Sequence, residues 1–589
     1  MGGPSSATLR CSYSALVRAS STSSLANTLA LIFAEMFKKL KADLKTIKSK
    51  LAVSSDTWTT RSMMFTFAGS IGSWITEDWE LVERVLDFHP IEDKEHEGKY
   101  AGAAMARRLS ELGVLEQLSA GVFDSATTND VLMRTLSRIL MEKFDIQFVP
   151  ENSQIRCLAH VVNLVVQKFL ATLNEADDPE VVDYYLPNKD LPFHYDPDDD
   201  PDLRDLENET FEDEEVVQDE GELDAETMTE LAAELAKLSP LQKLRLTMTK
   251  ICASPQRRKQ FKSTAASIYQ DKLHKSGRKV SSLMVICDVK HRWNFTEAMI
   301  SRALVLRKAI QRWVLERDEL HPLLLSDEHW KLLEALGGIL KVFTKVTLQM
   351  SKSSTPTLPW VLPMYEKMLV HLWSTRADEK ILQPLRVAAS AGLEKLEMYY
   401  AKARACQFNI IVTVLHPSLG LSWFRKLDQG EERQEHAQIL FTHVFQAYKK
   451  TYDDEKAASR AQEGNSDVQA RPVASASFLD DICMFDADDK IPLTGAINEL
   501  DQFFSAFQTY GRGDHDGPLL WWKEFAHHFP VVARMARDFL AIPGTSVSVE
   551  RLFSKSRHLC HEAQGSMKAE TIMKAMLTKM WIKAGYLEY

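Results

Sequence analysis

The sequence has few cysteines and no long apolar run, and these two absences narrow the class of protein. Seven cysteines are scattered over 589 residues, an odd number that does not suggest a disulfide framework. We therefore expect reduced thiols in an intracellular compartment. No stretch approaches the roughly 18 unbroken apolar residues of a membrane span, and the first twenty residues lack the apolar core of a secretory signal. We expect no membrane partner.

The composition is that of a globular protein, with 45% hydrophobic and 26% charged residues. These values exclude a wholly disordered chain, a collagen-like fibre and a disulfide knot. At about 150 residues a domain, the length predicts about three to four domains.

The net charge of −11 conceals two segments of opposite sign. Between Glu175 and Glu226 there are 23 acidic residues against two basic ones, whereas between Lys237 and Arg312 there are 18 basic residues against three acidic ones. Such asymmetry is typical of a nucleic-acid-binding surface with an acidic tether that screens it. The alternative is two solvated stretches that only keep the chain soluble.

Changes in periodicity divide the chain into five regions. Residues 1–50 are predicted to be helical from about Leu25, because apolar residues recur at three-to-four spacing. Residues 51–173 show the pattern β-β-β-α-β-α-β-α, which predicts an α/β fold with a mixed sheet and helices on its faces. The other regions are an acidic segment expected to be disordered, a basic and mostly helical region, and a helical C-terminal region, at 174–226, 227–494 and 495–589.

Two aspartates are predicted to lie at the ends of strands. Asp56 lies at the end of the first predicted strand and Asp124 ends the fourth, and these strands can be neighbours in a sheet of this order. Paired carboxylates supply the hard oxygen ligands that hold Mg²⁺ with room for phosphate oxygens. The alternative for each aspartate alone is a turn or helix-capping residue.

Other motifs have structural alternatives that are at least as strong. Cys157 and His160 form a C-x-x-H pair, but zinc needs four ligands and no second pair with suitable spacing is near. We therefore expect a buried structural cysteine and histidine. Trp293, beside Arg292 in the basic region, would suit base stacking on distorted DNA or would pack in a core.

In their order, these segments resemble the hAT superfamily of DNA transposases. The matching blocks are Asp56–Thr59, Asp124–Asn129, Arg156–Leu164, Arg292–Asn294, and a C-terminal block with Trp521-Trp522, Phe529-Pro530, Ala536–Leu540 and Ser546–Ser554. Any one block is weak, but five in this order across residues 51–589 are specific.

The resemblance implies an RNase H-like core that is interrupted by a large all-α insertion and completed by the C-terminal region. By the family pattern, Asp56, Asp124 and Glu550 form a D-D-E triad that binds two Mg²⁺ (or Mn²⁺) ions, and zinc is not expected. Arg292 and Trp293 match the residues associated with a flipped base at a hairpin-forming DNA end. The implied activity is cut-and-paste transposition on DNA in the nucleus.

The resemblance also implies a homodimer or a higher homo-oligomer. The residues expected to take part in dimerisation are Trp521, Trp522, Phe529, Leu540 and Phe553. The sequence departs from the pattern at Ser125, His291 and Val549, none of which is an expected metal ligand.

A further departure concerns the zinc finger that precedes the core in family members. No C-x-x-C…H pattern of a BED zinc finger occurs before Leu51, so the sequence is expected to lack this element. The alternatives are a shortened gene, the loss of this domain, or recognition of element ends by another part of the system. The alternative function is a domesticated or decayed protein that binds DNA and dimerises without catalysis.

Overall fold

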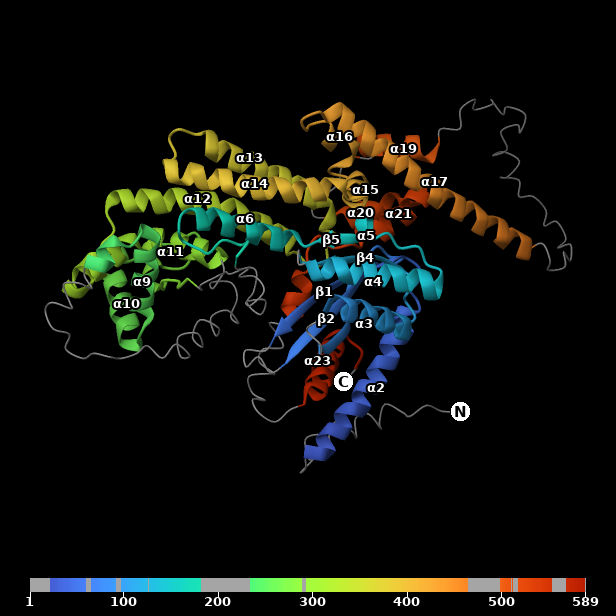
Figure 1. Ribbon diagram of the computed structural model, residues 1–589, viewed down its shortest axis with the longest axis horizontal. Helices are drawn as coiled ribbons and strands as arrows, with labels where there is room; N and C mark the ends of the chain where they lie inside the picture. Colours follow the sequence, from blue (N-terminus) through green and yellow to red (C-terminus); the bar gives the residue numbers. More distant parts are fainter. Residues whose placement is uncertain are drawn as a thin grey trace, which may run out of the picture.

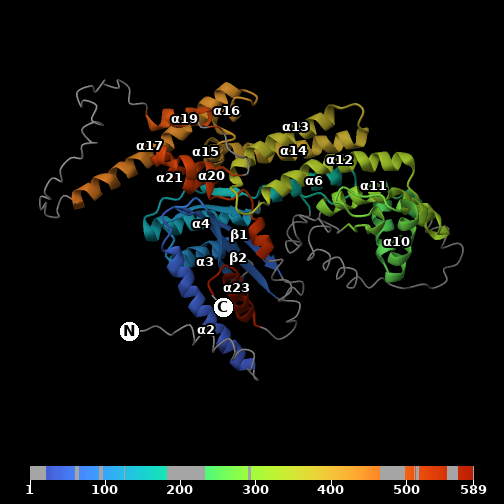
Figure 2. The ribbon, with the colours of Figure 1, turned by 180° about the vertical axis from the view of Figure 1, so that it is seen from behind.

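A mixed sheet and a long assembly of helices make up the part of the chain that can be described (Figure 1). The computed structural model describes residues 22–59, 65–91, 97–124, 127–181, 233–288, 293–463, 498–509, 511, 517–552 and 568–587. The helices of residues 240–405 extend to one side of the sheet, whereas the long helix of residues 430–463 extends to the other, and the view from behind shows the same arrangement (Figure 2).

The sheet has five strands in the order β3-β2-β1-β4-β5. The strands are β1 (Leu51–Thr59), β2 (Thr66–Ile75), β3 (Leu81–Ile91), β4 (Leu118–Phe123) and β5 (Gln154–Arg156). The first three strands pair antiparallel, whereas β4 lies parallel to β1, and β5 parallel to β4. The predicted mixed sheet and the predicted order of elements are confirmed.

The two faces of the sheet belong to different hydrophobic cores, because side chains alternate along a strand. Leu51 and Val53 face a core built with α2 (Thr22–Leu44), α3 (Glu97–Leu112), α4 (Thr127–Phe144) and α23 (Ala569–Lys583). Ala52, Ala120 and Val122 face the other core, which contains α6 (Leu158–Thr172) and most of the helical assembly. By the same alternation, Asp56 and Asp124 belong to the face that α6 covers.

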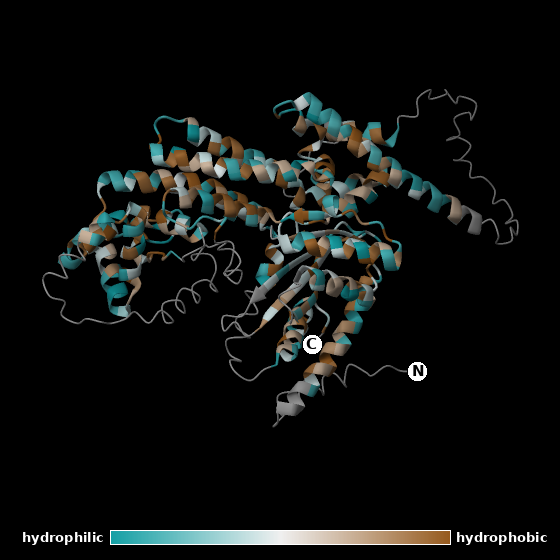
Figure 3. Cartoon of the chain, viewed as in Figure 1, coloured by the Kyte–Doolittle hydropathy of each residue, from teal (hydrophilic) through white to brown (hydrophobic). Residues whose placement is uncertain are grey.

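The region after the acidic segment is helical, as predicted. Its elements are α9 (Pro240–Cys252), α10 (Pro255–Tyr269), η2 (Val280–Ser282), α11 (Trp293–Leu315), η3 (Asp318–Leu323), α12 (Asp327–Met350), η4 (Leu358–Trp360), α13 (Val361–Ala377), α14 (Gln383–Ala405), α15 (Gln407–Leu415), α16 (Gly420–Phe424) and α17 (Gly430–Glu463). Two of these helices begin with a capping box, in which an N-terminal serine and the residue three positions later exchange hydrogen bonds. The pairs are Ser239 and Gln242 at α9, and Ser326 and His329 at α12. Brown and teal residues alternate along α12, α13 and α14, as expected for helices with one buried face (Figure 3).

The C-terminal region joins the helical assembly to the sheet. Its elements are α19 (Glu499–Thr509), α20 (Pro518–Phe525), η5 (Ala526–His528), α21 (Pro530–Leu540) and α23. The Trp522 ring stacks on that of Trp79, with centroids 5.6 Å apart. At the other end, α23 packs on β3 and α2, and the Trp581 indole N–H donates to the Val85 carbonyl at 2.8 Å.

The remaining short helix, α5 (Pro150–Ser153), precedes β5. None of the helices within the described ranges has the length and apolar content to cross a bilayer. Of the acidic segment expected to be disordered, residues 174–181 are placed in the structure, and Glu175 is held there by hydrogen bonds. The rest of that segment lies outside the described residues.

Candidate active site

The two predicted aspartates lie at the same edge of the sheet. The pairing of β1 with β4 runs in register to Ser54 and Val122, and two further residues along each strand bring Asp56 level with Asp124. Both side chains are buried, at 5% and 3% exposure. The predicted adjacency of the first and fourth strands is confirmed. The prediction that Asp56 ends its strand is wrong, because β1 continues to Thr59 in antiparallel pairing with β2. Asp56 therefore lies within β1, just beyond its pairing with β4, whereas Asp124 directly follows β4.

Each aspartate accepts a local hydrogen bond that orients its side chain. The Thr57 amide N–H donates to Asp56 Oδ1 at 2.8 Å, and the Asn129 Nδ2 amide donates to Asp124 Oδ1 at 2.5 Å. Asn129 lies in the first turn of α4, so the helix that follows β4 fixes the second aspartate. The sequence analysis assigned no role to Asn129, although it closes the Asp124–Asn129 block.

Glu550 reaches the same region from the far end of the chain. It lies in the helical turn 547–552 and is 2% exposed. The Ser546 amide N–H, at the start of this turn, donates to Cys157 Sγ at 3.3 Å. The Cys157 N–H in turn donates to the Phe123 carbonyl at 2.7 Å, one residue before Asp124. The third predicted carboxylate is thus connected to the end of β4 through Cys157.

The thiol of Cys157 is inert in this environment. Burial, followed by the negative charge of Glu550, raises the pKa of the Cys157 thiol to about 12. A thiol with such a pKa stays protonated at neutral pH and is a poor nucleophile and a poor metal ligand. His160 is also buried, at 2% exposure. Both residues therefore lie in the interior, where the sequence analysis expected them.

The donor chemistry of the site fits a hard divalent cation, since its three charged groups are carboxylates. Asp56, Asp124 and Glu550 are the residues that would hold Mg²⁺ or Mn²⁺. However, no group of three or more histidine, cysteine, aspartate or glutamate side chains in the described ranges is arranged to hold a metal ion. The carboxylates are brought to one region, but they are not drawn together as a closed ligand set.

Trp293, predicted to stack on a DNA base or to pack in a core, lies in a core in this conformation. It is the first residue of α11, is 4% exposed, and its ring meets that of Phe343 edge-on with centroids 6.4 Å apart. Base stacking by Trp293 would require the N-terminal turn of α11 to move. Its predicted partner, Arg292, lies outside the described residues.

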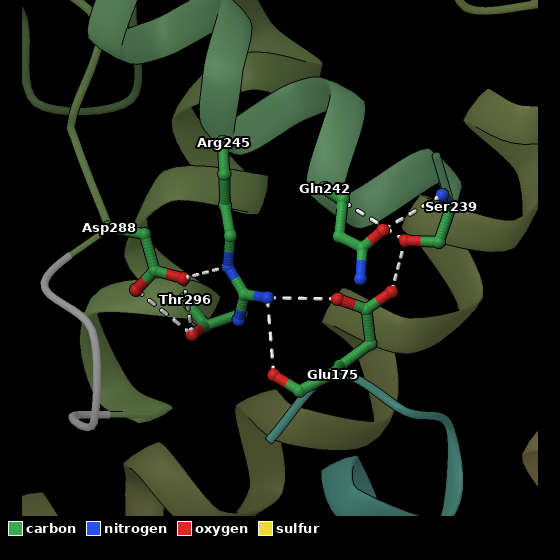
Figure 4. Close-up of polar contacts among 6 residues, drawn as sticks. All are labelled: Glu175, Ser239, Gln242, Arg245, Asp288 and Thr296. Atoms are coloured by element: carbon green, nitrogen blue, oxygen red, sulfur yellow. Dashed lines mark hydrogen bonds and ion pairs between the residues drawn. The ribbon is translucent and has the colours of Figure 1, made fainter. Parts of the chain in front are cut away.

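A buried ionic network holds the chain that leads into α11 (Figure 4). Arg245 donates to Glu175 Oε2 at 2.8 Å and to Asp288 Oδ2 at 2.5 Å. Ser239 and Thr296 donate their hydroxyl hydrogens to Glu175 and Asp288, respectively. The network joins the start of the acidic segment and the start of α9 to residues that flank Trp293. Apart from the charges of these residues, no sequence pattern predicts this network.

The residues expected at a dimer interface are instead packed inside the subunit. Trp521, Trp522, Phe529 and Leu540 are 4%, 0%, 1% and 0% exposed. The two indole N–H groups donate to the carbonyls of Gly511 and Leu415, both at 3.1 Å. These side chains are satisfied within one chain, because α20 and α21 fill the space between the sheet and the helices. Phe553 lies outside the described residues.

A family model agrees with this part of the chain. The model of the hAT family C-terminal dimerisation region matches residues 499–582. A Zea mays protein provisionally named an AC transposase is 21% identical over 572 residues, which cover 94% of this chain and 59% of that protein. The chain is a homologue of the hAT transposases. The match to a dimerisation region supports homo-oligomerisation of this homologue.

Two other relatives have different names. A Talaromyces stipitatus protein provisionally named transcriptional regulator tpeD is 24% identical over 535 residues, covering 90% of this chain and 53% of that protein. The zinc finger BED domain-containing protein RICESLEEPER 2 of Oryza sativa subsp. japonica is 20% identical, covering 93% of this chain and 68% of that protein. The hAT homologue thus spans a little over half the length of the tpeD and AC relatives.

Proposed function

We propose that this hAT homologue is a cut-and-paste transposase that hydrolyses and transesterifies phosphodiester bonds of DNA. The observation that carries the proposal is the placement of Asp56 and Asp124, two residues beyond the last pair, Ser54 and Val122, of the adjacent parallel strands β1 and β4. Glu550, a distant residue, is connected to the same strand end through Cys157. The activity would take place in the nucleus.

The strand order supports an RNase H-like core as part of this proposal. Three antiparallel strands continue into two parallel ones, and the parallel pairing of β1 with β4 ends two residues before the aspartates. The long helical assembly lies between β5 and the turn of Glu550 in the sequence, as an insertion would. The helical assembly would then be a platform for DNA beside the carboxylates.

The three carboxylates would hold two divalent cations, which supply Lewis-acid stabilisation and an activated water when they are bound. The residues of this chain orient that site. Thr57 and Asn129 fix one oxygen of each aspartate, and burial keeps bulk water away from the carboxylates. Glu550 would add a third negative charge to the two of the aspartates, against the four positive charges of two divalent cations.

A nicking assay on supercoiled DNA with Mg²⁺ or Mn²⁺ tests the proposal. We expect Asp56→Asn, Asp124→Asn and Glu550→Gln each to abolish cleavage while leaving the fold intact. Asp145→Asn is the matched control, because Asp145 is exposed, lies in the same region of the chain, and has a positive φ of 55° that asparagine tolerates. Cleavage that survives in the Asp124→Asn variant would show that the mechanism is wrong.

A second candidate is a DNA-binding, dimerising protein that has lost catalysis. It is favoured by the similarity to the protein named transcriptional regulator tpeD. Both candidates predict DNA binding that weakens steeply with salt, because phosphate contacts release counterions. Metal-dependent cleavage of DNA that carries the cognate ends separates them, since only the transposase would cleave it.

A further inference from the structure

We propose that Cys157 is a positioning residue, which holds the helical turn of Glu550 beside the end of β4, where Asp124 lies. The inference rests on the proposed function, because it assigns Glu550 a place in the active site. It also gives a role to Cys157 of the C-x-x-H pair, a residue that is neither a proposed metal ligand nor a proposed catalytic residue.

The position of Cys157 is set by the sheet. It follows directly after β5, and its N–H donates to the carbonyl of Phe123, the last residue of β4, at 2.7 Å. The residue after Phe123 is Asp124, so Cys157 is fixed one residue from the second aspartate. Its side chain is fully buried.

The sulfur atom then holds the start of the Glu550 turn. Cys157 Sγ accepts a hydrogen bond from the Ser546 amide N–H at 3.3 Å. The Ser546 carbonyl in turn accepts the amide N–H of Glu550, also at 3.3 Å. Two consecutive hydrogen bonds thus connect the thiol to the backbone of Glu550, across 389 positions of sequence between Cys157 and Ser546.

Further contacts join the same two segments, the start of α6 and the turn before Glu550. The Leu158 N–H donates to the Gly544 carbonyl at 3.1 Å, and Cys157, Ala159 and Val547 form a small hydrophobic cluster of their own. The Glu550 turn therefore rests on the corner between β5 and α6 through a polar and an apolar contact. Among these contacts, only the one to sulfur can be removed by changing a single side-chain atom.

The opposite side of the turn is fixed by the loop between α12 and α13. Thr545 donates its hydroxyl hydrogen to the Met350 carbonyl at 3.1 Å, and the Gly544 N–H donates to Thr357 Oγ1 at 2.9 Å. A Cβ on Gly544 would lie only 2.6 Å from the Met350 side chain, so no larger residue fits there without a shift. The turn is held between the sheet and the helices, and Cys157 provides the contact on the sheet side.

Cysteine suits this role for a physical reason. The site needs a small hydrogen-bond acceptor that stays uncharged next to a glutamate, and a buried thiol meets both conditions. Serine keeps an acceptor at this position, whereas alanine removes it. The two substitutions therefore separate the hydrogen bond from the packing.

Hydrogen exchange on the full-length protein tests the placement without requiring activity. We expect Cys157→Ala to increase amide exchange in the peptide that spans residues 544–552, and Cys157→Ser to restore much of the protection. Cys252→Ala is the matched control, because Cys252 is an equally buried cysteine in α9, far along the chain from Glu550. Unchanged exchange in Cys157→Ala would overturn the proposal, as would an equal change in Cys252→Ala.

Nicking kinetics provide the second readout. Loss of a residue that positions a ligand typically lowers activity by about 10- to 100-fold, and we expect a kcat decrease of this order in Cys157→Ala. The KM for DNA should stay the same, because Cys157 is fully buried and cannot contact DNA, and Cys157→Ser should recover most of kcat. If Cys157→Ala cleaves as fast as the native protein, the positioning role is wrong. If the native protein does not cleave cognate DNA but the exchange result holds, the proposed function fails and the placement by Cys157 stands.

Discussion

Removal of the Arg245 side chain is the most direct test of the buried network that supports α11. Arg245 is the cation shared by Glu175 and Asp288, whose side chains are each only 5% exposed. In Arg245→Ala, two buried carboxylates would lose their ion-pair partner. Breaking a buried ion pair in this way costs about 3–5 kcal/mol, mostly as the penalty for leaving charge unpaired.

Two features of the structure suggest that the loss of stability in Arg245→Ala lies at the lower end of this range. Arg245 itself is 26% exposed, so water can replace part of its contacts. The hydroxyl groups of Ser239 and Thr296 would still donate to the two carboxylates. We therefore expect Arg245→Ala to lower the free energy of unfolding by about 3 kcal/mol, measured by urea titration with far-UV circular dichroism.

The pH dependence of this loss has a definite sign. Burial raises the pKa of Glu175, and its hydrogen bond to Ser239 and the charge of Arg245 oppose that rise. A carboxyl group with a raised pKa in the folded state favours folding at low pH and loses that contribution as the pH rises through the folded pKa. Without Arg245 the pKa of Glu175 should rise further, so the difference between variant and native protein should shrink on mild acidification.

Arg312→Ala is the control for this experiment. Arg312, in the last turn of α11, pairs at 2.8 Å with Glu316, which directly follows this helix, but the two side chains are 57% and 46% exposed. Such a surface pair contributes only about 0.3–0.5 kcal/mol. If Arg245→Ala destabilises the protein no more than Arg312→Ala does, the network does not support α11, and this reasoning about buried charge is refuted.

Three further variants test other parts of the structure. Trp522→Ala should lower the free energy of unfolding by about 3–5 kcal/mol in a urea titration, because the ring is fully buried within the subunit. Leu520→Asp should instead weaken self-association in analytical ultracentrifugation without changing the urea midpoint, because Leu520 is 70% exposed; an unchanged association constant would exclude this surface from the interface. Although burial opposes it, the bonds from His89 and Arg108 lower the pKa of Asp87. The native protein should therefore lose stability as the pH falls through this lowered pKa, and Asp87→Asn should lose less over the same acidic range in urea titrations.

The sheet was predictable because each strand is marked by the residue pattern of its own short segment. Alternating β-branched and aromatic residues marked β1 to β3, and the order of strands and helices placed Asp56 and Asp124 on neighbouring strands. The connection of Glu550 to the same edge was not readable from periodicity, since it depends on a backbone N–H meeting a sulfur atom 389 positions away. Only the family resemblance singled out Glu550.

For Trp521 and Trp522, the sequence predicted burial but not the surface against which they are buried. Two adjacent tryptophans in a helix look the same in the sequence whether they pack against a partner subunit or inside their own subunit, since both environments bury apolar surface. Here Trp522 stacks on Trp79 beside the sheet, whereas Leu520, between buried neighbours, faces outward. The sequence could identify the buried block but could not tell which side of α20 belongs to the subunit interior.

This packing changes how truncations of the C-terminal region should be interpreted. A truncation before Asp501 removes Glu550, but it also removes Trp522 and Trp581, which fill two separate cores. Loss of activity in such a truncation would follow from unfolding alone and would say nothing of the carboxylate. Glu550→Gln leaves both tryptophans in place, so only the point variant tests the catalytic assignment. In the same way, loss of self-association tests the dimer surface only where the altered residue is exposed, as Leu520 is. Many apolar side chains of residues 499–582, which match the dimerisation region, pack inside their own subunit. We therefore expect a dimer interface to use the exposed side of the same helices.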